Sequence, residues 1–90
     1  MADFISSIKR NGGYIVHKPS NAGGIGMLFR GWDESGENYI FGHDNGMIFI
    51  DADYAQVVAT TLGDGWKVTK VSELTASDFA TMKALAAIFD

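Results

Sequence analysis

Apolar residues near the N-terminus recur with the spacing of a helix. Phe4, Ile5 and Ile8 lie on one helical side, Asp3 stands where a cap belongs, and glycines follow from Gly12. The pattern predicts a short N-terminal helix ahead of the first strand.

The next part of the chain has the alternation and the turn residues of antiparallel strands. Strands are predicted over 13–18, 25–32 and 39–43, with Pro19 closing the first and a glycine-rich loop after it. Gly26 and Gly31 within the second strand suggest a bulge or a close backbone approach. Residues 33–36 form the turn that returns the chain into the third strand.

The dipeptide Asn45-Gly46 lies between two apolar runs and favours a two-residue type I′ hairpin. That turn would make residues 47–51 a further strand, with His43 facing Ile48 and Gly42 facing Phe49. The predicted core face then holds Tyr39, Phe41, His43, Ile48 and Ile50. The opposite face, only partly covered, holds Ile40, Gly42, Asp44, Met47, Phe49 and Asp51.

From Asp53 the period changes again, because Tyr54, Val57, Val58 and Leu62 have helical spacing. Asp53 is the expected cap and Gly63 the expected stop. A strand over 65–71 follows. A last helix is predicted from a capping box of Thr75 and Asp78 and a staple of Leu74 and Phe79, with the apolar stripe Phe79, Met82, Leu85, Ala86 and Phe89.

These elements give the order α-β-β-β-β-α-β-α within one α+β domain over residues 1–90. Short connections favour a meander, so we expect a twisted antiparallel sheet of about five strands with the helices packed on one face.

Composition narrows the function classes. The 90 residues are 47% apolar, which suits a packed core, and the absence of cysteine excludes disulfides, thiolate metal sites and cysteine nucleophiles. Eleven acidic and seven scattered basic residues give a net charge of −4, which disfavours nucleic acid and anionic membranes as partners. No segment approaches the roughly 20 apolar residues of a membrane span, so a cytoplasmic protein is expected.

Motifs of catalysis, cofactor binding and metal binding are weak. Residues 23–26 are glycine-rich but lack the spacing of a phosphate-binding loop. Residues 33–37 begin like a calcium loop, yet Asn38 stands where the glycine belongs. His17, expected to be exposed, and His43, expected to be partly buried and hydrogen-bonded, have no partner acid by spacing. We therefore expect no catalytic residues, no cofactor, no metal and no enzymatic activity; an enzyme would require His17 or His43 beside a carboxylate in a cleft.

Residues 29–32, Phe-Arg-Gly-Trp, combine residue types that are common at binding hot spots. Regular strand alternation puts Arg30 and Trp32 on one face, where they either form a binding surface or pack with Trp32 in the core. The binding surface is predicted to comprise Arg30, Trp32, Asp33, Glu34, Glu37, Met47 and Phe49. The hypothesis is a small acidic binding protein that regulates or inhibits a larger protein, of the kind encoded by phages and mobile elements.

Three alternatives stay open at this point. A small-molecule domain would use a pocket between sheet and helices lined by Trp32, Tyr39 and His43. An acidic mimic of nucleic acid would use the charged turns. Self-association through an exposed sheet edge or through the Phe49 face is a variant of the binding hypothesis.

Overall fold

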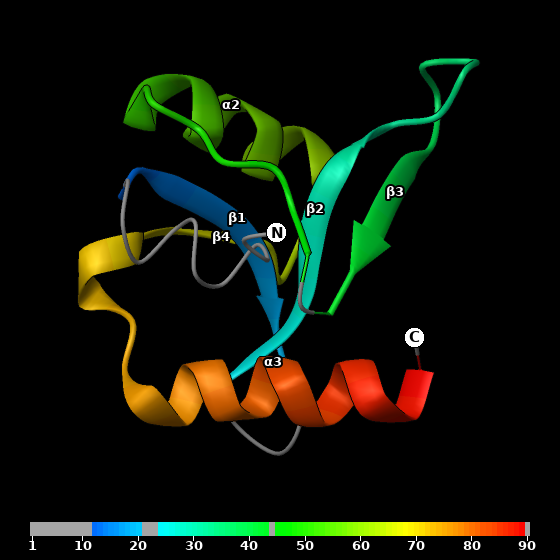
Figure 1. Cartoon of the computed structure of the whole chain (residues 1–90). Coiled ribbons are helices and arrows are strands. Elements are labelled where there is room, and N and C mark those ends of the chain that lie inside the picture. The colour runs from blue at the N-terminus through cyan, green and yellow to red at the C-terminus, as the bar shows by residue number, and fades with distance from the viewer. Residues whose placement is uncertain (1–11, 21–23, 44, 90) are drawn as a thin grey trace.

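The computed structural model describes residues 12–20, 24–43 and 45–89 (Figure 1). The predicted N-terminal helix lies outside these residues. The elements are β1 (Tyr14–Pro19), β2 (Ile25–Trp32), β3 (Tyr39–Gly42), α2 (Ala52–Leu62), β4 (Lys67–Lys70), a 3-10 turn (Val71–Glu73) and α3 (Ala76–Phe89).

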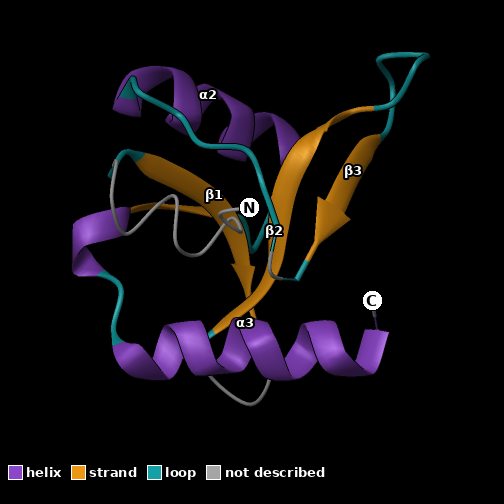
Figure 2. Ribbon diagram, in the orientation of Figure 1, coloured by secondary structure: helices purple, strands orange, loops and turns teal. Residues whose placement is uncertain are grey.

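The described part of the chain forms a four-stranded antiparallel sheet in the order β3-β2-β1-β4. The predicted α+β class is confirmed, but the prediction of five strands is wrong. The two helices lie on opposite faces of the sheet (Figure 2), so the expected packing of the helices on one face is also wrong.

Two apolar cores explain this three-layer arrangement. Ile15 and Val16 are neighbours on β1 and both are fully buried, because alternate strand residues point to opposite faces. The core beneath α3 contains Ile15, Ile25, Leu28, Val71 and Met82. The core beneath α2 contains Val16, Phe29, Phe49, Ala55, Val58, Ala59 and Trp66. A sheet buried on both faces needs a helix on each.

The predicted Asn45-Gly46 hairpin is wrong. Residues 47–51 form no strand with β3, and neither Asn45 nor Gly46 has the positive φ that a type I′ turn requires. The Met47 N–H instead donates to the Phe29 carbonyl at 2.8 Å, and Phe49 exchanges two backbone hydrogen bonds of 2.8 Å with Tyr14. This pairing with β1 and β2 places the Phe49 ring in the α2 core, which a pairing with β3 would not do.

The ends of α2 have the expected kinds of capping residue, but its N-cap lies two residues earlier than predicted. α2 is capped by Asp51, whose carboxylate accepts from the Asp53 N–H at 2.9 Å, and not by Asp53 as expected. Its buried residues are Ala55, Val58 and Ala59, so the predicted stripe is rotated and Tyr54 is exposed. The stop at Gly63 is confirmed by its φ of 105°.

The start of α3 agrees with the sequence. Asp78 accepts from the Thr75 N–H at 2.8 Å, and its own N–H donates to the Thr75 hydroxyl at 3.2 Å. Leu74 and Phe79 both pack against the α3 core, as the predicted staple requires. Neither α3 nor any other helix in the described ranges is both long and apolar enough to cross a membrane.

Candidate functional site: an aromatic face beside an acidic turn

A bulge in β2 determines which side chains share a face. Phe29 pairs with Phe41 of β3, but the next pair is Gly31 with Ile40, so Arg30 is the extra residue. Gly31 has a φ of 141°, which a residue with a side chain rarely adopts. The alternation of β2 therefore shifts by one residue beyond Phe29.

The shift separates Arg30 from Trp32. The Trp32 ring lies edge-on to Phe29 at 5.3 Å, on the α2 side of the sheet. Arg30 lies on the α3 side, where its Cδ atom is 2.9 Å from the position that a Cβ on Gly42 would take. The prediction that Arg30 and Trp32 share one face is wrong, because it assumed regular alternation through Gly31.

Three exposed aromatic side chains, Trp32, Tyr39 and Phe41, lie together on the α2 side of β2 and β3. They are 39%, 38% and 46% exposed and are called the aromatic face below. Trp32 is the cross-strand partner of Tyr39, and the Tyr39 and Phe41 rings are 6.2 Å apart. Figure 1 shows why the face is open: α2 lies over β1 and β4, with β3 away from it at the rim of the sheet.

Buried aromatic rings of the α2 core contact Trp32 and Tyr39 from the side. Tyr39 meets Trp66 edge-on at 5.2 Å, and Phe29, which contacts Trp32 edge-on, stacks on Phe49 at 6.1 Å. Trp66 and Phe49 both belong to the α2 core. The rings of Trp32 and Tyr39 are therefore held by packing against rings that are themselves fixed.

The acidic turn begins directly after Trp32. One oxygen of Asp33 accepts from the Ser35 hydroxyl at 2.6 Å and from the Ser35 and Gly36 N–H groups at 3.1 Å. The hydrogen bond from Ser35 is the main cause that lowers the pKa of the Asp33 carboxyl. Asp33 thus organises the turn, and the exposed carboxylates at its tip are those of Glu34 and Glu37.

The remaining two surface predictions have different outcomes. Met47 is exposed, as a binding residue must be. Phe49 is only 3% exposed, and its ring is enclosed by Phe29 on one side and Tyr54, 5.5 Å away, on another. Phe49 therefore belongs to the core and is removed from the predicted surface.

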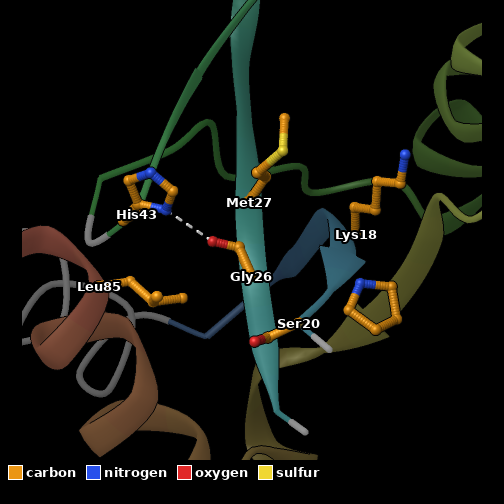
Figure 3. A pocket seen from close by; sticks show the side chains of 7 residues that line it. Lys18, Ser20, Gly26, Met27, His43 and Leu85 are labelled. Atoms are coloured by element: carbon orange, nitrogen blue, oxygen red, sulfur yellow. Dashed lines mark hydrogen bonds between the residues drawn. The ribbon is translucent and has the colours of Figure 1, made fainter. Parts of the chain in front are cut away.

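A pocket of about 370 Å³ lies between the end of β1, the start of β2, the residue that follows β3, and α3 (Figure 3). Its lining is Lys18, Pro19, Ser20, Gly26, Met27, His43 and Leu85. The ring of His43 is buried, as expected, and its Nδ1–H donates to the Gly26 carbonyl at 2.7 Å. Trp32 and Tyr39, the predicted companions of His43, do not line it. Sequence spacing gave no signal for Lys18, Ser20 and Leu85, because the fold brings the end of β1 next to Leu85 of α3, which lies more than 60 residues later in the chain.

His17 differs from its prediction, since it is 7% exposed instead of solvated. Its Nε2 atom lies 2.6 Å from the Thr69 hydroxyl, and its Nδ1 atom has no hydrogen-bond partner among the described residues. Burial lowers the pKa of His17, the Asp78 charge opposes that change, and Lys67 adds to it. The group in contact with the imidazole is thus a hydroxyl, which does not activate a histidine as a base.

No group of three histidine or carboxylate side chains gathers as a metal site within the described ranges. No family model matches the chain, and no curated protein or solved structure matches it either. The functional assignment therefore rests on the geometry of the aromatic face, the acidic turn and the pocket.

Proposed function

We propose that the chain is a non-enzymatic cytoplasmic binding protein that regulates or inhibits a larger protein partner. The contact surface is the aromatic face together with Glu34 and Glu37. The observation that carries this proposal is the group of three exposed rings on a sheet face that α2 covers elsewhere.

The type of residue supports protein recognition. Trp and Tyr are enriched among the residues that contribute most to protein–protein affinity, because they bury a large area and lose little conformational entropy. The rings of Trp32 and Tyr39 are already fixed by contacts with Phe29 and Trp66. A partner that covers this face therefore gains apolar burial without ordering a mobile side chain.

The acidic turn places negative charge at one end of the binding surface. Glu34 and Glu37 lie at the end of the β2–β3 pair, next to the cross-strand pair of Trp32 and Tyr39. Carboxylates at the rim of an apolar patch favour a basic partner surface and speed its encounter. The partner is expected to combine an apolar recess with nearby Lys or Arg.

The test is affinity purification from the native host, with the captured proteins identified by mass spectrometry. Wild-type protein should capture a partner that the double variant Trp32→Ala/Phe41→Ala loses, since truncation of a hot-spot ring costs about 2 kcal/mol or more. Arg30→Ala is the matched control, because this exposed residue of the same strand lies on the other sheet face. Arg30→Ala should capture the same partner.

Capture of that partner by the double variant would contradict the proposal. Circular dichroism and thermal melting separate loss of contact from loss of fold, and the double variant must remain folded at the temperature of the assay.

The pocket favours a second candidate function, binding of a small molecule. Its volume lies in the range of ligand sites, and Lys18, Ser20 and His43 provide polar groups beside the apolar Met27 and Leu85. A fragment screen followed by backbone NMR tests it. Shift changes confined to these five residues support the pocket, and changes spread over the aromatic face instead do not.

A further inference from the structure

The two edge strands of the sheet are very different in sequence. β4 carries lysines at both ends, Lys67 and Lys70, and lysine on an edge strand discourages pairing with another chain. β3, at the other edge, has the uncharged sequence Tyr-Ile-Phe-Gly without proline. Ile40 is 43% exposed and lies between two exposed aromatic residues. The lysines of β4 therefore disfavour pairing of that edge with another strand, whereas β3 has no charge that would prevent it.

We propose that β3 pairs antiparallel with β3 of a second copy of this chain, so that one sheet continues through both molecules. Alternate residues of an antiparallel edge strand direct their backbone N–H and C=O groups away from their own sheet, and an identical strand supplies matching donors and acceptors. Figure 1 shows β3 at the rim with no element of the described chain beside its outer edge. The occupant is a second copy because two identical antiparallel β3 strands match donors with acceptors and, in the register described next, aromatic residues with aromatic residues.

A two-fold axis perpendicular to the sheet limits the register of this pairing. Such an axis keeps the faces matched, so residues opposite one another must come from the same face. Centred on Ile40, it places Tyr39 of each copy opposite Phe41 of the other and brings the two Ile40 side chains together. Aromatic cross-strand pairs and paired β-branched residues both stabilise antiparallel strands.

The charges favour the antiparallel arrangement in particular. The acidic turn, residues 33–37, lies at one end of β3, while residues 39–42 carry no charge. Antiparallel pairing puts Glu37 of each copy at an opposite end of the strand pair, roughly 20 Å from the other at about 3.4 Å per residue. That distance exceeds the screening length of about 8 Å in physiological salt. The two Glu37 carboxylates are therefore screened from each other in this dimer, whereas parallel pairing would juxtapose the acidic turns.

The inference does not depend on the proposed function, because it uses the backbone edge of β3 and not the open side of the aromatic rings. In the dimer, the aromatic faces of the two copies become neighbours on the same side of the continuous sheet. A partner-binding surface would thereby be doubled and not blocked.

Sedimentation equilibrium tests the pairing. The wild-type chain should approach twice its 9.7 kDa mass as its concentration rises to about 1 mM. Ile40→Lys and Ile40→Glu should each be monomeric, since like charges would face each other at the two-fold axis. An equimolar mixture of the two variants should restore a dimer with one copy of each. Ile88→Lys is the matched control, because Ile88 is an isoleucine that is 70% exposed and belongs to α3 instead of the β3 edge, and this variant should dimerise like the wild type.

A wild-type chain that stays monomeric throughout this range, or an Ile40→Lys variant that stays dimeric, overturns the inference. Circular dichroism of each variant confirms that monomers are folded monomers. Partner capture by monomeric Ile40→Lys shows that the proposed function survives without the dimer, and a dimer that captures nothing shows the reverse.

Discussion

The Nε2 atom of His17 lies 2.6 Å from the Thr69 hydroxyl, across the β1–β4 pair. The other ring nitrogen, Nδ1, is buried without a partner in the described part of the chain. A neutral imidazole can share one hydrogen with Thr69, but a protonated ring would have a second N–H without an acceptor. Folding therefore favours the neutral ring.

Stability should consequently fall in mildly acidic solution. The pKa of His17 is lowered in the folded chain, mainly by burial, whereas the unfolded chain keeps the ordinary value of 6.5. As the pH falls below 6.5, the unfolded state takes up a proton that the folded state resists, so the free energy of unfolding decreases until the folded pKa is reached. Above 6.5 this contribution is fully present. Urea titrations between about pH 5 and pH 8 measure it.

His17→Gln is the control for this pH dependence. Its amide can still bond to Thr69 but does not titrate, so the slope of stability against pH should decrease near 6.5. An unchanged slope in His17→Gln would assign the pH dependence to other groups.

A second prediction concerns the bulge in β2 and compares two glycines whose φ angles differ. Gly31 has a φ of 141°, outside the left-handed region that asparagine tolerates, while Gly36 has a φ of 75°, close to it. No neighbour would obstruct a Cβ at either position, so backbone strain decides the cost. Gly31→Asn should lower the free energy of unfolding by about 1–3 kcal/mol and Gly36→Asn by less than about 1 kcal/mol, measured by urea titration.

A cost at Gly31 as small as the cost expected at Gly36 would mean that β2 can lose its bulge without penalty. The partition of Arg30 and Trp32 between the two sheet faces would then lack its cause.

Local signals in the sequence were sufficient for most elements. The bounds of β2 agree with the predicted 25–32, because alternating apolar residues and flanking turn residues lie within the strand itself. The bulge was also signalled by Gly31. The sequence did not show which residue is extra, and a one-residue shift moves every later side chain to the other face. For this reason the predicted strand of Trp32 is correct, but the prediction that Arg30 lies on the same face is wrong.

The failure of the Asn45-Gly46 hairpin has a non-local cause. The dipeptide favours a tight turn. Pairing of Phe49 with Tyr14, 35 residues earlier, and burial of its ring under α2 stabilise the fold more than that turn would. Which strands pair here depends on the packing of the whole core and not on the local turn sequence. The lining of the pocket around His43 and the position of β3 at the sheet edge follow from the same long-range pairing, so spacing did not identify which residues line the pocket or which strand is open.

The capping box of α3 makes a third prediction. The Thr75 hydroxyl accepts from the Asp78 N–H and also donates to the Asp78 carboxylate at 3.1 Å. Thr75→Ala removes both bonds and should cost about 1 kcal/mol in the free energy of unfolding, measured by urea titration. Ser77→Ala, at an exposed position in the first turn of the same helix, should cost less, and a larger loss at Ser77 would show that the cap is not the stabilising contact.

Two phenylalanines provide the clearest test of the observed packing, because the sequence pattern and the structure assign them opposite roles. The predicted hairpin put Phe41 in the core and Phe49 on a partly covered face, whereas in the structure Phe49 is buried and Phe41 is open to solvent. Phe49→Ala leaves a cavity between Phe29 and Tyr54 and should cost about 3–5 kcal/mol in the free energy of unfolding. Phe41→Ala should cost less than about 1.5 kcal/mol, since its exposed ring contacts only Tyr39 and His43 among the aromatic side chains described. Urea titration of both variants decides between the two arrangements, and the reverse order of costs would restore the hairpin of residues 43–48.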